Sequence, residues 1–75
     1  MVRTHTIETL SFNNQMLHII IDGQTLNIPL QNLSNKLLLA TDIERNLFTI
    51  SPSGYGIHWP LLDEDISIEA LLKSL

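Results

Sequence analysis

Most of the side chains in this 75-residue chain that could do chemistry lie between residues 55 and 65. Tyr55, His58 and Trp59 come shortly before the acids Asp63 and Glu64. An aromatic ring beside carboxylates can anchor a protein partner, whereas an imidazole beside carboxylates can hold a metal or move protons. The segment is therefore a candidate for partner binding, for a metal site and for catalysis.

The spacing of the histidines disfavours a metal site. Four residues separate His58 from Asp63, and no two histidines stand at the spacing that places two imidazoles on one metal. His5 and His18 are expected on the less apolar face of a sheet, as exposed or hydrogen-bonded imidazoles. We therefore predict no metal and no cofactor.

Catalysis is disfavoured as well. General acid–base chemistry needs two titratable groups whose environments separate their pKa values within one cleft. The consecutive acids at positions 63–65 are more simply explained as a solvated turn before a helix. We expect no catalytic residue, and a small metal-dependent or hydrolytic enzyme that uses His58 with Asp63 or Glu64 is the alternative.

Partner binding is left as the main functional interpretation of this segment. Trp59 is the only tryptophan, and core packing is its simplest role. The alternative is that the aromatic rings stay partly exposed beside an acidic rim and bind a basic partner. The Trp59–Pro60 peptide bond is expected to be trans. The predicted partner-binding residues are Tyr55, His58, Trp59, Asp63 and Glu64.

Composition limits the classes of protein that this chain can represent. Seventy-five residues predict a single domain, 1–75, and the absence of cysteine favours the cytoplasm and a core of aliphatic side chains. Eight acids against four scattered bases give a net charge of −4, which disfavours nucleic-acid binding because that needs clustered cations. We expect neither a leader nor a membrane span, because no apolar stretch is long enough.

The first thirty residues predict a three-stranded antiparallel meander. Asn13-Asn14 and Asp22-Gly23 both suit two-residue turns, which would place Leu10 opposite Leu17 and Ile19 opposite Leu26. One face of the sheet is then strongly apolar, while the other is mixed and is either exposed or covered by a partner. Pro29 lacks an amide hydrogen, so the third strand lies at an edge or ends there.

The rest of the chain predicts short helices, a second hairpin and a C-terminal helix. Leucine spacing indicates helical structure over residues 31–40, and Thr41 with Glu44 forms a capping box for a helix over 42–46. Residues 47–51 and 55–59 form a hairpin around a turn at 52–54. Ser67 caps a final helix with an apolar stripe that packs on the sheet. The fold class is α+β.

The order of motifs in the second half resembles a known bacterial family, domain of unknown function 2442. The resemblance is carried by Ser-Gly-Tyr-Gly-Ile-His-Trp-Pro at 53–60 and Leu-Asp-Glu-Asp-Ile-Ser at 62–67. It implies a small α+β domain, often encoded beside domain of unknown function 4160 in a layout similar to a toxin–antitoxin pair. It supplies no catalytic residues.

Together these patterns favour a cytoplasmic, non-enzymatic interaction module that resembles the antitoxin-like half of such a pair. The expected partner is a small, basic, toxin-like protein, and self-association as a homodimeric adaptor or sensor is the alternative. Neither nucleic acid nor membrane is expected as a partner.

Overall fold

Two antiparallel sheets form the frame of the protein in the computed structural model, which describes residues 5–52 and 54–73. The first sheet contains β1 (Ile7–Asn13), β2 (Met16–Ile21) and β3 (Gln24–Pro29) in that order. The second contains β4 (Thr49–Ile50), β5 (Gly56–Trp59) and β6 (Glu64–Ser67), also in chain order. The predicted α+β class and the three-stranded meander are confirmed.

The β2–β3 hairpin has the predicted register. Asp22 and Gly23 have φ values of 52° and 81°, as a two-residue turn with two left-handed positions requires. Ile19 therefore pairs with Leu26. Pro29 pairs with Met16 and is the last residue of β3, which is an edge strand. This agrees with the prediction made from the absence of an amide hydrogen on proline.

The register predicted for the β1–β2 hairpin is wrong by two residues. The turn lies at Asn14 and Gln15, with φ values of 50° and 63°, so that Leu10 pairs with Ile19 instead of Leu17. A shift of two residues leaves the side chains from Thr9 onward on their predicted faces, because side chains alternate along a strand. Ile7, expected on the mixed face, instead lies opposite Ile21 on the core face, because the register is irregular between Ile7 and Thr9. The apolar face was therefore identified correctly in spite of the wrong turn.

Three short helical segments follow the first sheet. They are the 3-10 helix η1 (Leu30–Asn32), α1 (Asn35–Leu38) and α2 (Asp42–Asn46). The predicted capping box is present, since Thr41 Oγ1 accepts a hydrogen bond from the Glu44 amide and the Glu44 carboxylate accepts one from the Thr41 amide. Ser34 caps α1 in a similar way by accepting from the amide of Leu37.

The acids predicted as a solvated turn are partly strand. Residues 60–63 form the turn, in which Asp63 has a φ of 49°, and β6 begins at Glu64. The predicted second hairpin is thus the first two strands of a three-stranded sheet. Ser67 then begins α3 (Ile68–Lys73), as predicted, with its hydroxyl accepting from the amide of Ala70 at 2.9 Å. Ser53, in the predicted 52–54 turn, and Leu75, in the apolar stripe predicted for the final helix, lie outside the described residues.

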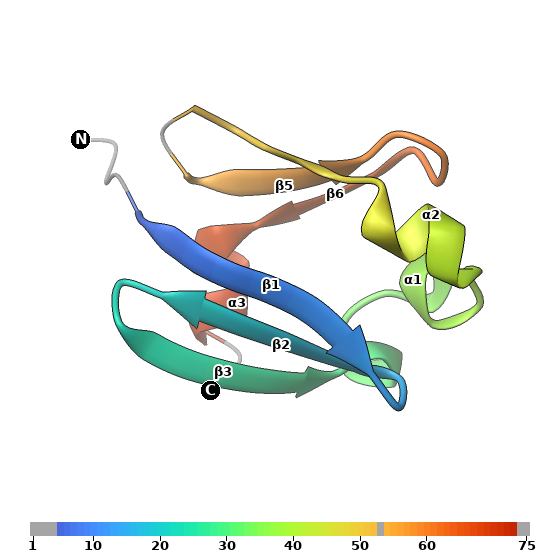
Figure 1. Cartoon of the computed structure of the whole chain (residues 1–75), viewed down its shortest axis with the longest axis horizontal. Coiled ribbons are helices and arrows are strands. Elements are labelled where there is room, and N and C mark those ends of the chain that lie inside the picture. Colours follow the sequence, from blue (N-terminus) through green and yellow to red (C-terminus); the bar gives the residue numbers. More distant parts are fainter. Residues whose placement is uncertain (1–4, 53, 74–75) are drawn as a thin grey trace.

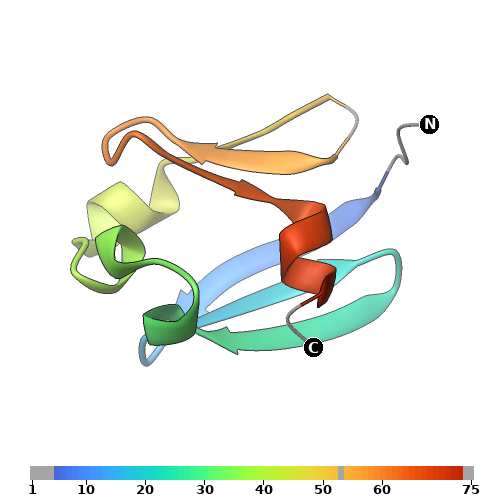
Figure 2. The ribbon, with the colours of Figure 1, turned by 180° about the vertical axis from the view of Figure 1, so that it is seen from behind.

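The core lies between the two sheets. Figure 1 shows the sheets as two layers, with α1 and α2 at one end, and the reverse view in Figure 2 shows α3 beside the layers at the other end. The largest buried side chain is Trp59, which is 0% exposed. The other fully buried side chains come from both sheets, the helical segments and α3: Leu17, Ile19, Ile21, Leu26, Leu30, Leu37, Ile57, Ile68 and Leu71.

Candidate functional site

The five predicted partner-binding residues are divided among the core and two separate surfaces. Trp59 lies in the core, Tyr55 and His58 lie on the outer surface of the second sheet, and Asp63 and Glu64 lie at the turn between β5 and β6. The sequence segment is therefore not one site.

Trp59 connects the second sheet to the helices. Its indole Nε1 donates a hydrogen bond to the carbonyl of Arg45 at 2.9 Å, and its ring lies 6.4 Å from Phe12 and 6.3 Å from Phe48, measured between centroids. The interpretation of Trp59 as a core residue is confirmed. Its ring is not available as a surface anchor, and no peptide bond among the described residues is cis.

The turn between β5 and β6 is attached to α1 by two hydrogen bonds. Ser34 Oγ donates to Glu64 Oε2 at 2.5 Å, and Lys36 Nζ donates to the carbonyl oxygen of Asp63 at 3.2 Å. The Glu64 carboxylate therefore has a structural partner, whereas the Asp63 side chain is exposed.

We use the term helical end for α1, α2, the residues that follow each of them and the 60–63 turn, which lie together in Figures 1 and 2. The guanidinium of Arg45 holds it together by donating to the carbonyls of Leu37 and Leu38 at 2.9 and 2.8 Å. Several large aliphatic side chains of the helical end are nevertheless exposed: Leu39, Ile43, Leu47 and Leu61. Leucine spacing did not predict this exposure, because it only indicated helical structure.

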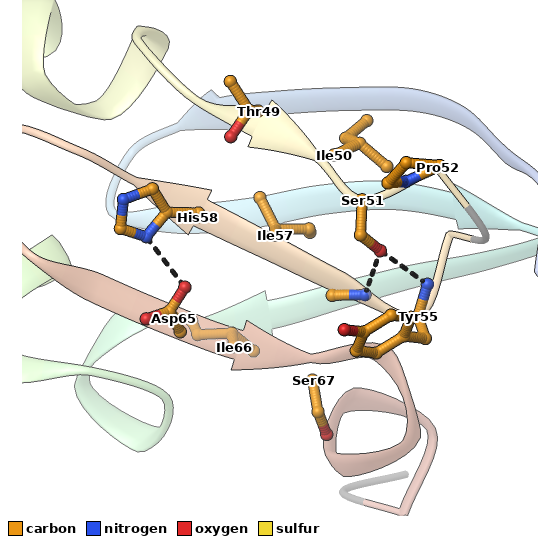
Figure 3. Close-up of a pocket in the computed structure, with 11 residues that line it drawn as sticks. Thr49, Ile50, Ser51, Pro52, Tyr55, Ile57, His58, Asp65, Ile66 and Ser67 are labelled. Carbon is orange, nitrogen blue, oxygen red and sulfur yellow. Dashed lines mark hydrogen bonds and ion pairs between the residues drawn. The ribbon is translucent and has the colours of Figure 1, made fainter. Parts of the chain in front are cut away.

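The outer surface of the second sheet is hollowed into an open groove of about 550 Å³. Two cross-strand rows line it, Thr49–His58–Asp65 and Ser51–Gly56–Ser67. Glycine at the centre of the second row leaves a gap between two serines. Figure 3 shows His58 and Asp65 at one end of the groove and Tyr55 and Pro52 at the other.

His58 is paired with Asp65 and not with the acids predicted for it. His58 Nδ1 lies 2.7 Å from Asp65 Oδ1, because the two residues are direct partners in the β5–β6 register. Both side chains are substantially exposed, so the pair contributes little to stability. Asp65 was missed because the acids were interpreted as a turn. A hairpin centred on residues 60–63 would have placed it opposite His58.

His5 is hydrogen-bonded, as expected, but it is buried and precedes β1 instead of lying on the less apolar face of the sheet. Its side chain is 3% exposed, with Nδ1 at 2.8 Å from Asp22 Oδ2 and Nε2 at 3.5 Å from Glu69 Oε1. His18 is hydrogen-bonded to Asn27, which agrees with its expectation. The hydrogen bond with Asp22 raises the pKa of His5 above its ordinary value of 6.5, against the effect of burial, and Glu69 adds to the rise.

We expect the free energy of unfolding to fall as pH rises above 6.5, because the folded state binds the His5 proton more tightly than the unfolded chain. The contribution is complete below 6.5 and is lost as pH passes through the raised pKa of folded His5. Urea unfolding from about pH 6 to about pH 9 measures this slope. His5→Gln should flatten it, whereas His18→Gln should retain it. Equal slopes in the wild type and His5→Gln would contradict the prediction.

The described residues contain no group of three or more His, Asp or Glu side chains that could hold a metal ion. Across the same residues, no helix has the length and apolar character needed to cross a membrane. The groove offers hydrogen bonding by hydroxyls, one imidazole and one carboxylate, together with the packing surface of one aromatic ring.

A family model described as protein of unknown function DUF2442 matches residues 7–75. The chain therefore belongs to this family, and the resemblance noted in the sequence is confirmed. No curated protein and no solved structure matches the chain.

Proposed function

We propose that the chain is a non-enzymatic, cytoplasmic protein-interaction module that resembles the antitoxin-like half of a bacterial two-gene pair. In this proposal the helical end binds the partner. The observation that carries the proposal is the exposure of large aliphatic side chains there, with Leu39 83% and Ile43 76% exposed.

Exposed apolar side chains on several neighbouring segments are typical of interaction surfaces. The interior of the protein is already filled from both sheets and α3, so the exposed leucines do not result from a missing core. The helical end is also held in place without a partner, by the Arg45 and Trp59 hydrogen bonds. A preformed surface of this kind can bind without a large ordering entropy.

The charge of the chain favours a basic partner. The sequence has eight acids and four bases. One of these bases, Arg45, donates hydrogen bonds from its guanidinium to backbone carbonyls. Asp42 and Asp63 are exposed at the helical end. Acidic side chains around apolar anchors speed association with a basic surface and disfavour an acidic one.

Two observations support a function without catalysis. The described residues lack a cluster of metal-ligating side chains. Within the same part of the chain, His58 is hydrogen-bonded only to Asp65, so no hydroxyl is joined to its second nitrogen as a nucleophile would be.

The proposal is tested by co-expression with the product of the adjacent gene, which in this family is often the small domain numbered 4160. We expect the two proteins to co-purify, and we expect Leu39→Ser with Ile43→Ser to weaken binding by about 30-fold or more, as for residues that dominate an interface. Isothermal titration calorimetry measures the change.

The matched control is Ile50→Ser, which removes an exposed apolar side chain from β4 of the second sheet instead. This control should bind as the wild type does. Failure to co-purify at micromolar concentration, or equal losses in the two variants, would overturn the proposal. A dimeric mass for the isolated chain, reduced to a monomer by the Leu39 and Ile43 changes, would instead indicate the homodimeric alternative.

A further inference from the structure

The groove on the second sheet is deep because Gly56 has no side chain, although the backbone there would accept one. Gly56 does not have a positive φ, and a Cβ added there would meet nothing nearer than the carbonyl oxygen of Ile66 at 3.6 Å. This distance is an ordinary van der Waals contact. Glycine is thus not required by the turn chemistry or packing of β5, and its effect is to open space between Ser51 and Ser67.

One end of this space carries an incompletely paired carboxylate. Asp65 Oδ1 interacts with His58, while Oδ2 accepts no hydrogen bond from the residues that the structure describes. The Asp65 side chain is 76% exposed. No lysine or arginine lines the groove, so the carboxylate has no cation from this face of the described chain.

The other end of the space is apolar and aromatic. Tyr55 is 54% exposed. Its side chain stands with Pro52 beyond the serine row, as Figure 3 shows. The serine row and the Asp65 row are two residues apart along the strands, which is about 7 Å. A ligand that fits therefore needs an unbranched apolar stem about that long and a cationic head.

We propose that the groove binds an arginine side chain of a protein partner. The guanidinium pairs with Asp65 Oδ2, the methylene stem lies over Gly56, and the Tyr55 ring packs against the stem. Arginine fits better than lysine because its planar head donates to a carboxylate through two parallel hydrogen bonds and is more weakly hydrated. This site is distinct from the helical end, and the inference stands or fails independently of the function proposed above.

The test is an NMR titration of the isolated full chain with the peptide acetyl-Gly-Arg-Gly-amide. We expect saturable shifts of the Gly56, His58, Asp65 and Ser67 amides. The same peptide with citrulline, which keeps the shape of arginine without its charge, should bind about fivefold more weakly or worse, as expected for loss of a partly exposed ion pair. The lysine peptide should bind between the two.

Two variants and one control locate the site. Asp65→Asn should remove the preference for arginine over citrulline, and Gly56→Val should prevent binding by filling the space above β5. Asp63→Asn removes an exposed acid at the helical end and should leave binding unchanged. If Gly56→Val does not fold, the comparison of Asp65→Asn with Asp63→Asn decides the question alone.

Three results would overturn the inference. They are shifts confined to the helical end, equal affinity for the arginine and citrulline peptides, and an arginine preference that persists in Asp65→Asn. Because the titration contains no partner protein and is read at groove amides, its outcome is separate from the co-purification experiment.

Discussion

Gly54→Ala is expected to destabilise the protein by about 2 to 4 kcal/mol, whereas Gly23→Ala should cost only about 1 to 2 kcal/mol. Both glycines have positive φ values, 69° and 81°, so both substitutions strain the backbone. At Gly23 a new Cβ meets nothing within 4 Å, but at Gly54 it would lie 2.0 Å from the carbonyl oxygen of His5. That oxygen belongs to the backbone and cannot move aside without shifting the start of β1.

The pair of variants separates backbone strain from steric overlap. Thermal unfolding followed by circular dichroism should show a midpoint for Gly54→Ala that is lower than that of Gly23→Ala by roughly 4 °C or more, since 1 kcal/mol changes the midpoint of a domain of this size by about 4 to 8 °C. Equal midpoints for the two variants would show that the close approach of Gly54 to His5 does not constrain the fold.

The contact at Gly54 also explains why the burial of His5 was not predictable. His5 is covered by the β2–β3 turn through Asp22 and by α3 through Glu69, while Gly54 packs on its carbonyl. These three elements are far apart in sequence, and no local pattern connects them. Alternation along β1 also failed before Thr9, because an irregularity in the register between Ile7 and Thr9 places Ile7 opposite the buried Ile21. A buried imidazole between two carboxylates is in addition a tertiary feature.

Local patterns predicted the elements well where turn or cap chemistry is specific. The Asp22-Gly23 turn and the Thr41 capping box were predicted at the correct residues, because few residue types satisfy either arrangement. The Asn13-Asn14 signal was ambiguous, since Asn14 begins the actual turn and Gln15 occupies the second left-handed position, which glutamine rarely does.

The candidate site was predicted less well than the fold, because β6 was not recognised. Consecutive acids concealed the alternation in which Ile66 and Ile68 are buried while Asp65 and Ser67 are exposed. Because β6 was not predicted, the sequence offered neither a partner strand for His58 nor a groove. The predicted recognition segment therefore contained residues of two surfaces and the core, which only the register between β5 and β6 could separate.

Trp59→Ala is expected to have the largest effect of any single substitution considered, about 3 to 5 kcal/mol. The side chain is fully buried, contacts two further aromatic rings and satisfies the carbonyl of Arg45. Its removal would leave a large cavity between the second sheet and the helices. A domain of this size has a total stability of roughly 4 to 11 kcal/mol, so the variant should be partly or largely unfolded at physiological temperature.

Trp59→Phe separates packing from the hydrogen bond. Phenylalanine keeps much of the apolar volume but leaves the Arg45 carbonyl without its indole donor, so we expect a loss of about 1 to 3 kcal/mol. Tyr55→Ala removes an exposed aromatic ring and should change stability by about 0.5 kcal/mol or less. Urea unfolding must be followed by far-ultraviolet circular dichroism, because Trp59 is the only tryptophan that could report by fluorescence.

Local hydrogen exchange in Trp59→Phe tests whether Trp59 supports the helical end in particular. Because Arg45 contacts Trp59 through its carbonyl and α1 through its guanidinium, loss of the indole should loosen α1 and α2 before the first sheet. Amide hydrogen exchange in Trp59→Phe should then be faster in α2 than in β2, relative to the wild type. Uniform acceleration across both sheets and the helices would show instead that Trp59 stabilises the whole domain equally and that the helical end does not depend on it in particular.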